Sequence, residues 1–152
     1  MTKKPKINPD YTWYKLAIIK SKIHRHGVVA QENIPAGKYV MEYTGVLMNR
    51  KQHKEWEATA PQEVQIYAWE VPKNDKSWIA YWTLDGYVNG SGAEYVNASC
   101  DPNLEPVFFG KRLYYRSTRR IKKGEELTIF YGKPYFTSRK LHCGCGAPNC
   151  FK

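Results

Sequence analysis

The sequence lacks the apolar segments that mark membrane and secreted proteins. No run approaches the roughly 20 apolar residues that span a bilayer. Residues 1–6 are basic but lack the apolar stretch of a secretory signal. No repeat or low-complexity segment is present. We therefore expect an intracellular protein with no membrane association, nuclear in a eukaryote or cytoplasmic in a prokaryote, in a reducing compartment where disulfides are rare.

Cysteine is scarce, and its four occurrences are unevenly placed. Three lie within residues 143–150, interleaved with glycine and proline, and Cys100 is the fourth. Since a structural zinc site takes four protein ligands, the pattern predicts one zinc ion bound by Cys100, Cys143, Cys145 and Cys150. A disulfide pair or unrelated buried thiols are the alternatives. The ion would be architectural, joining the C-terminal tail to the turn around Cys100.

Acidic residues are also in the minority, with 14 Asp and Glu against 24 Lys and Arg, which gives a formal net charge of +10. The excess favours association with chromatin or a nucleoid, or the handling of basic tails. A solvated basic surface that only aids solubility is the other interpretation. No fingerprint of sequence-specific nucleic-acid binding accompanies the charge.

The 152 residues are enough for one hydrophobic core and too few for two domains. Strand-forming residues dominate, which predicts a mainly β fold of several small sheets with short helices. We expect a basic N-terminal arm at 1–15 that is flexible before Trp13, followed by strands at 16–19, 28–30 and 39–45. An insert region at 48–80 follows, with a helix at 50–58 capped by Asn49. A hairpin of 66–71 with 78–82 begins in this region, and further strands are expected at 108–109 and 113–115.

Three motifs carry the chemistry. Residues 97–103 read Asn-Ala-Ser-Cys-Asp-Pro-Asn, a turn dense in side-chain donors and acceptors that is suited to hold a ligand. Residues 124–131 read Gly-Glu-Glu-Leu-Thr-Ile-Phe-Tyr, and residues 143–150 hold the three clustered cysteines. In order and spacing they resemble the signatures of the SET-domain protein lysine methyltransferases, with a post-SET tail. The resemblance covers residues 16–150.

This resemblance implies a SET catalytic domain at 16–132 and a post-SET zinc-binding tail at 133–152. It also implies a fold in which a C-terminal segment threads beneath a loop in a pseudoknot-like manner. The cofactor would be S-adenosylmethionine, leaving S-adenosylhomocysteine as product. The partner would be a protein or peptide lysine substrate, such as a histone or another basic protein, whose deprotonated amine attacks the methyl group in line.

The resemblance also assigns roles to residues. Tyr131 would orient the lysine amine, although a simple sheet tyrosine is the alternative. Tyr67 would assist at the catalytic site and line the lysine channel with Ile129 and Tyr115, although it could merely pack the sheet. Because Ile129 has no hydroxyl to hold a blocking water, the enzyme would add two or three methyl groups. The cofactor-binding residues would be Arg25, His26, Gly27, Tyr95, Asn97, Ala98, Phe130 and Tyr131.

Several positions depart from the family pattern. Arg25 replaces the first glycine of a Gly-x-Gly loop, which strains the loop if its φ is positive. Glu94 stands where an arginine is usual, near the carboxylate of the cofactor, and Ser91 replaces an asparagine. Ala98 replaces a histidine, and Phe130 replaces an aspartate and could stack near adenine or fill the core. These departures keep open a non-catalytic SET-like module that binds basic peptides or nucleic acid, and more weakly a zinc-knuckle nucleic-acid binder.

Overall fold

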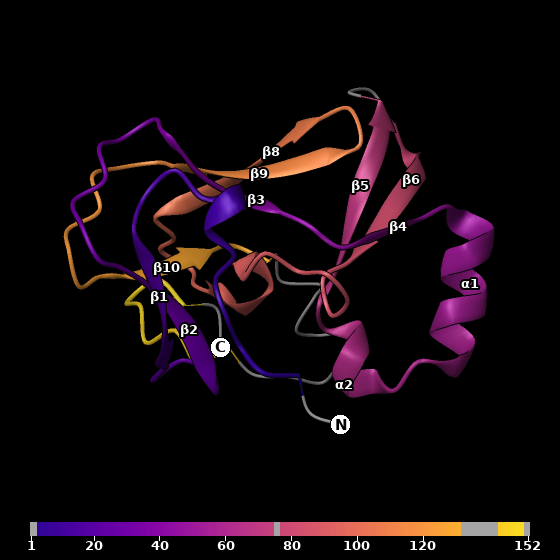
Figure 1. The fold of residues 1–152 in the computed structure, drawn as a ribbon, viewed down its shortest axis with the longest axis horizontal. Helices are drawn as coiled ribbons and strands as arrows, with labels where there is room; N and C mark the ends of the chain where they lie inside the picture. The colour runs from indigo at the N-terminus through magenta and orange to yellow at the C-terminus, as the bar shows by residue number, and fades with distance from the viewer. Residues whose placement is uncertain (1–2, 75–76, 132–142, 151–152) are drawn as a thin grey trace.

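The computed structural model describes residues 3–74, 77–131 and 143–150, and strands form most of its regular structure (Figure 1). The predicted mainly β fold of small sheets with short helices is confirmed. In chain order the elements are η1 Pro9–Tyr11, β1 Leu16–Lys20, β2 His26–Ala30, β3 Tyr39–Tyr43, β4 Val46–Met48, α1 Arg50–Thr59, α2 Gln62–Gln65, β5 Ala68–Asn74, β6 Ser77–Asp85, η2 Ala93–Tyr95, β7 Asn97–Ala98, β8 Leu104–Phe109, β9 Arg112–Ser117 and β10 Glu126–Ile129.

The larger sheet of the described region brings the motifs together. Its strand order is β1-β2-β10-β8-β9-β3, and β7 pairs with β10 outside this path. Strand β10 runs parallel to both neighbouring motif segments, with Thr128 opposite Asn97 and Ile129 opposite Leu104. It is antiparallel to β2 on the other side. The strand that ends just before Tyr131 therefore lies between the 24–27 loop and the 97–103 turn.

The second sheet has the order β4-β6-β5, and α1 lies beside it at one end of the molecule (Figure 1). Helix α1 begins where the sequence predicts, because Asn49 and Gln52 form a reciprocal capping box. The predicted hairpin forms from β5 and β6. Strand β5 begins and ends later than expected, whereas β6 is longer than expected at both ends. No helix in the described part of the chain is long and apolar enough to cross a membrane.

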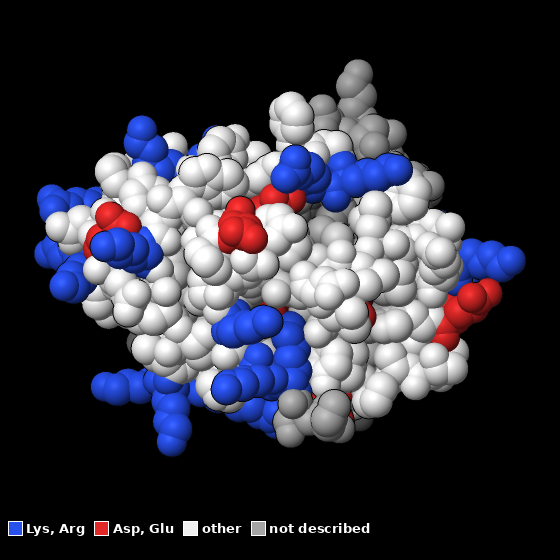
Figure 2. Space-filling view, in the orientation of Figure 1, with Lys and Arg blue, Asp and Glu red and all other residues white. Residues whose placement is uncertain are grey.

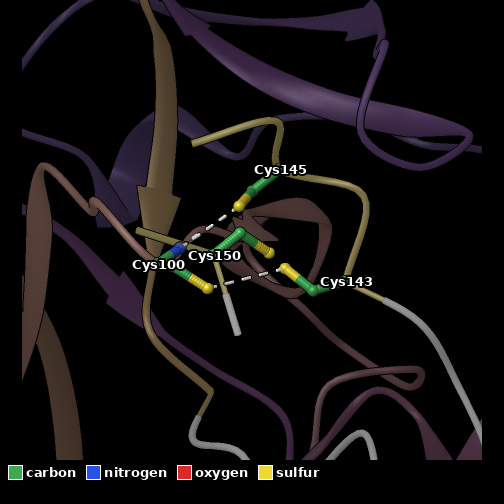
Figure 3. Close-up of side chains that lie close together, drawn as sticks. All are labelled: Cys100, Cys143, Cys145 and Cys150. Carbon is green, nitrogen blue, oxygen red and sulfur yellow. Dashed lines mark hydrogen bonds between the residues drawn. The ribbon is translucent and has the colours of Figure 1, made fainter. Parts of the chain in front are cut away.

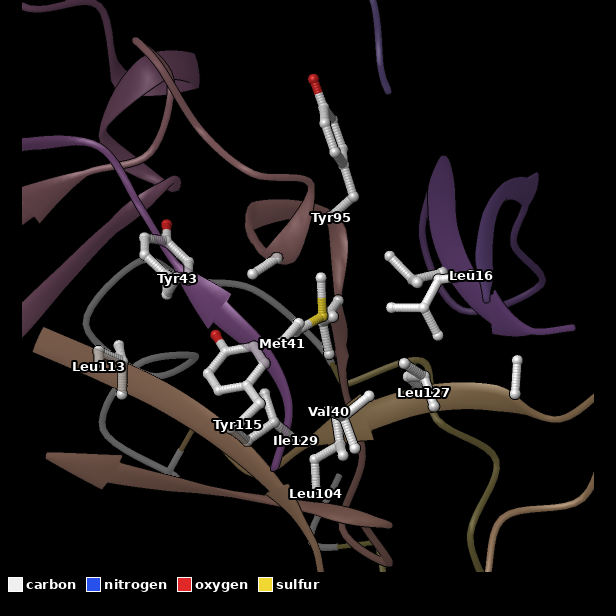
Figure 4. Close-up of a cluster of buried hydrophobic side chains, with 14 of the residues drawn as sticks. Leu16, Val40, Met41, Tyr43, Tyr95, Leu104, Leu113, Tyr115, Leu127 and Ile129 are labelled. Atoms are coloured by element: carbon white, nitrogen blue, oxygen red, sulfur yellow. The ribbon is translucent and has the colours of Figure 1, made fainter. Parts of the chain in front are cut away.

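The core lies where the large sheet folds over the 93–98 segment (Figure 4). Val40, Leu113, Leu127 and Ile129 are 0% exposed. Burying each such side chain contributes roughly 1.5–3 kcal/mol, so this cluster fixes the position of β10. Tyr95 also belongs to the core, but its ring extends away from the other labelled side chains (Figure 4).

The prediction of flexibility before Trp13 is wrong for the described residues 3–12. The Asn8 N–H donates to the Ser91 carbonyl at 2.8 Å, and Ile7 packs against the core. Thr12 forms a β-bridge with Met41. The segment is held because it carries apolar and hydrogen-bonding groups between its lysines. The predicted pseudoknot-like threading depends on residues 132–142, which lie outside the described residues.

Candidate functional site

The 24–27 loop is positioned by one amide side chain. The Nδ2 group of Asn97 donates to the carbonyls of His24 at 3.2 Å and His26 at 2.7 Å, and to Oε1 of Glu126 at 2.9 Å. The same Glu126 oxygen accepts a hydrogen bond from the Ser21 hydroxyl at 2.7 Å. Asn97 is thus the node that joins β7 and β10 to the loop. Its predicted contact with a cofactor stays a prediction.

Arg25 and Gly27 show why this loop has its shape. Arg25 has a φ of +36°, so the strain predicted for an arginine at this glycine position is present. Gly27 leaves room for a close neighbour, since a Cβ there would lie 2.2 Å from Oε1 of Glu126. Any side chain at Gly27 would therefore displace the carboxylate that Asn97 and Ser21 hold. Of the predicted loop residues, Arg25 and His26 are exposed and Gly27 is buried.

Aromatic rings from three other parts of the chain lie near Tyr131. Its ring packs edge-on against Trp69 at 6.3 Å between centroids. Trp69 in turn contacts Tyr115 at 6.2 Å and Tyr43 at 6.4 Å. Burial raises the pKa of Tyr43 and Tyr115 well above the ordinary value, so both stay neutral phenols. We call the rings of Tyr43, Trp69 and Tyr115 the aromatic cluster, and these three rings make an apolar surrounding for the Tyr131 side chain.

The Tyr131 hydroxyl donates to the carbonyl of Val96, directly before Asn97. Tyr131 is half-buried and packs against the main core and also against the small cluster of Ala98 and Cys143. It therefore connects the motif at 97–103 with the tail cysteines. The structure brings the predicted catalytic tyrosine to the predicted binding turn.

The three predicted channel residues differ in exposure. Ile129 and Tyr115 are 0% and 1% exposed and belong to the core, whereas Tyr67 is half-buried. The Tyr67 carbonyl accepts hydrogen bonds from the Tyr43 hydroxyl and from the Gly86 N–H. These contacts place Tyr67 next to the aromatic cluster, while its role in a channel stays a prediction.

Phe130 and Ala98 occupy contrasting environments. Phe130 is 47% exposed, so of its two predicted roles the filling of the core is excluded. Ala98 is buried against Cys143, where its small side chain leaves room for the tail. A larger residue here would press directly on the cysteine cluster.

Tyr95 and Tyr67 form a second aromatic group with Tyr87, with ring centroids 5.7 Å apart for Tyr67–Tyr95 and 5.8 Å apart for Tyr67–Tyr87. The ammonium group of Lys3 lies 5.2 to 5.8 Å from all three centroids. It also forms an ion pair with the buried Glu94 carboxylate at 2.6 Å. We call these three tyrosines the tyrosine cage. Through Tyr95, which is 6.1 Å from the His26 ring, the cage borders the 24–27 loop.

The cage has an unsatisfied group that a ligand could satisfy. The Tyr95 hydroxyl is buried and has no hydrogen-bond partner among the described residues. Burial and the nearby Glu94 carboxylate raise the Tyr95 pKa, so the hydroxyl keeps its proton and can donate. Buried hydroxyls are usually paired. The chemistry of this corner therefore fits a charged, hydrogen-bonding end of a ligand such as the implied cofactor.

The four cysteines converge as predicted (Figure 3). Their sulfur atoms all lie within 4.8 Å of one another, and the Sγ atoms of Cys100 and Cys143 are 3.9 Å apart. Tetrahedral zinc with Zn–S bonds of ~2.3 Å separates its sulfur ligands by about 3.8 Å, so the group fits a zinc ion. None of the four forms a disulfide in the described part of the chain, which excludes the disulfide alternative in this structure.

Backbone donors prepare this group for a cation. The Cys100 and Ala147 N–H groups point to Sγ of Cys145 at 3.5 and 3.4 Å. Although burial acts in the opposite direction, these donors lower the Cys145 pKa to about 6. Burial raises the pKa of Cys143. The Asn149 side chain donates to the Cys100 carbonyl at 2.9 Å, which ties the tail to the turn without any ion.

Sequence reasoning missed three residues of this site. Glu126 supports the loop, and Lys3 and Tyr87 complete the cage. Glu126 lies inside a recognised motif, so a closer inspection of its carboxylate could have found it. Lys3 gives no such signal, because it is one lysine among several in a basic segment.

Comparison with known proteins relates the chain to one family. A profile of the SET domain matches residues 25–132. Histone-lysine N-methyltransferase ASHH3 of Arabidopsis thaliana is 31% identical over 142 residues, which are 90% of this chain and 37% of the relative. Histone-lysine N-methyltransferase 2B of Homo sapiens is 31% identical over 144 residues, 89% of this chain and 5% of the relative. An H3 lysine-36 specific histone-lysine N-methyltransferase of Debaryomyces hansenii is 27% identical over 141 residues, 90% of this chain and 19% of the relative.

Proposed function

Because this chain belongs to the SET-domain family, we propose that it is a protein-lysine N-methyltransferase that uses S-adenosylmethionine. The names of its relatives support methyl transfer to lysine at the level of the family. The chain spans 37% or less of each relative named above, so its own activity and substrate belong to the proposal. The observation that carries it is the meeting of Tyr131, the aromatic cluster and the Asn97-supported loop.

The cofactor would lie along the 24–27 loop and the 97–98 strand. Arg25, His26 and Gly27 would line it from β2 and the loop before it, and Tyr95, Asn97 and Ala98 from the segment opposite. Phe130 and Tyr131 would close the third side, and the exposed Phe130 ring is available for stacking. When bound, S-adenosylmethionine supplies a methyl group made electrophilic by its sulfonium.

The protein must present the lysine amine without its proton. Free lysine has a pKa near ~10.4, so the neutral amine at pH 7 lies roughly 4–5 kcal/mol above the ammonium form. An apolar channel lowers that pKa, because burial disfavours the charged form. The rings of Tyr43, Trp69 and Tyr115 support this role, since they are packed together beside Tyr131 and two of them are fully buried.

Tyr131 would then orient the amine. Its hydroxyl donates to the Val96 carbonyl, which fixes the position of the phenol oxygen, and a phenol oxygen is able to accept from an amine N–H. Such an acceptor aims the nitrogen lone pair rather than removing a proton. Correct orientation of two reacting groups is a large term in catalysis, which is why a single hydroxyl matters.

One structural zinc ion held by the four cysteines would fix the tail against the 97–103 turn. The sulfur geometry supports this, and all four ligand positions would be filled by protein. The ion therefore serves architecture. Because Ala98 and Tyr131 pack on the same cluster, the tail would form one wall of the site.

We further propose that the substrate is a basic protein such as a histone. The names of the relatives support a histone, and the net charge of +10 supports a location near a polyanion such as chromatin. Lysine and arginine outnumber acidic side chains on the face shown in Figure 2.

The test is methyl transfer from isotopically labelled S-adenosylmethionine to core histones and to a whole-cell lysate, with Tyr131→Phe as matched control. The substitution removes one hydroxyl and keeps the ring, so we expect turnover to fall about 100-fold or more while S-adenosylhomocysteine binding is kept. Near-parental turnover by the folded variant would refute the role of Tyr131. A parental protein that binds the cofactor but methylates nothing would favour the non-catalytic SET-like module.

A further inference from the structure

Lys3 occupies the tyrosine cage as an internal cation. Its ammonium group donates to Oε1 of Glu94 and to the Gly86 carbonyl, each at 2.6 Å. The three tyrosine rings surround it at cation–π distance. The Lys3 side chain is 18% exposed and the Glu94 side chain 1%. A lysine so placed, more than 80 residues from its partners in sequence, is a built feature of the site.

The ion pair has a clear electrostatic reason. A carboxylate as buried as Glu94 is strongly destabilised without a counter-charge. Lys3 supplies that charge, and the Gly92 N–H donates to the second Glu94 oxygen at 2.8 Å. Among the other ionisable groups here, Arg25 acts on Tyr67 as a positive charge, and Asp85, whose pKa burial raises, faces Lys3. The group around the cage thus contains two cations, Lys3 and Arg25, and two carboxylates, Glu94 and Asp85.

Two donors in this corner are left for a ligand. An ammonium group has three N–H bonds, and the described residues accept two of those of Lys3. The Tyr95 hydroxyl is buried and without a partner in the same described region. Both groups belong to the cage that borders the 24–27 loop through His26. These two donors both belong to the cage, and one of them is charged, which matches the needs of a carboxylate.

We propose that Lys3 binds the carboxylate at the amino-acid end of the cofactor, with the Tyr95 hydroxyl as second donor. This inference rests on the proposed function and adds the N-terminal segment to the cofactor site. Lys3 acts there as a binding residue: it neutralises Glu94 on one side and presents an N–H to the ligand on the other. Asn8 and Ile7 hold the segment 3–12 against the rest of the domain, and this segment places Lys3 in the cage.

The test compares two ligands by calorimetry on the full chain. S-adenosylhomocysteine carries the carboxylate, and 5′-S-(3-aminopropyl)-5′-thioadenosine lacks only that group. We expect Lys3→Met to weaken S-adenosylhomocysteine about tenfold or more and to leave the decarboxylated ligand unchanged or tighter. Lys3→Arg should restore most of the affinity, because it keeps the charge. The exposed neighbour provides the matched control Lys4→Met, which should change neither ligand.

The outcomes separate the two proposals. If Lys3→Met weakens both ligands equally, Lys3 only supports the fold and the inference fails while the proposed function stands. If it tightens S-adenosylhomocysteine, Lys3 blocks the site and the inference is overturned. If the parental protein binds neither ligand, both proposals fail. The double variant Lys3→Met with Glu94→Gln leaves no unpaired carboxylate at position 94, so it tests the carboxylate preference even if Lys3→Met alone does not fold.

Discussion

Replacing Asn97 with aspartate should replace its hydrogen bond to Glu126 by repulsion between two carboxylates, next to the 24–27 loop that Asn97 positions. Asn97 Nδ2 lies 2.9 Å from the Glu126 carboxylate and donates to it. Aspartate has the same shape but places an oxygen there. At neutral pH two carboxylates would then face each other in a partly buried site. The backbone carbonyls of His24 and His26 would lose their donor at the same time.

The size of the effect follows from charge and protonation. Two like charges about 3 Å apart repel by roughly 5 kcal/mol at an effective dielectric constant of ~20. The variant can escape by protonating the introduced carboxyl, which at pH 7 costs about 4 kcal/mol from an unperturbed pKa near ~3.9. We therefore expect Asn97→Asp to lose up to about 4 kcal/mol more than Asn97→Ala. For a chain of this length that is a difference in Tm of roughly 8–16 °C.

The sign of the pH dependence is fixed by the introduced carboxyl. Its folded-state pKa lies above its unfolded value, so the folded state binds the extra proton. The penalty is absent below about pH 4, grows as pH rises above that value, and is complete once pH exceeds the raised pKa. When protonated, the carboxyl can donate its O–H to Glu126 and partly restore the node.

The assay is urea-induced unfolding of the parental protein, Asn97→Asp and Asn97→Ala between about pH 5 and pH 8. Differences between variants at each pH remove the acid sensitivity that all three share. Asn97→Ala should lose roughly 1–3 kcal/mol at every pH, because it removes the donor without adding charge. Equal, pH-independent losses for both variants would refute the account of Asn97 and Glu126 as one node.

The remaining predictions concern the metal and the product. The purified protein should carry about one zinc ion per chain. Chelation should release the tail and lower activity while the sheets stay folded, because the ion contributes on the order of 10 kcal/mol to the folding of the tail alone. Metal analysis that finds no zinc in active protein would contradict this. The parental enzyme should add two or three methyl groups to a peptide, as followed by mass spectrometry to completion. Ile129→Tyr should shift the product towards monomethyl-lysine and Ile129→Phe should not. Both variants overpack a fully buried position and should lose roughly 1–3 kcal/mol, so circular dichroism must first show that they fold. A parental enzyme that stops at one methyl would show that another group sets the pocket.

The sequence determined the local features of this protein. Asn49 predicted the start of α1, because a side chain that caps a helix acts within one turn. The four cysteines predicted their own cluster, because no other thiol exists to complete a four-ligand set. The ordered motifs at 97–103 and 124–131 predicted the family, which the profile match confirms. Arg25 was predicted to strain its loop if its φ were positive, and its φ is positive.

Only the tertiary structure decided which distant groups meet. Lys3 and Glu94 pair because the N-terminal segment returns along the 91–94 region, and no local pattern distinguishes Lys3 from its neighbours. Phe130 is 47% exposed although its neighbour Ile129 is fully buried, and Phe130 lies just beyond the end of β10. Whether a residue at a strand end is covered depends on which distant segments pack there, which the local sequence does not show. Long-range pairing depends on the packed core and on the charges it buries, and these are properties of the whole chain rather than of any segment.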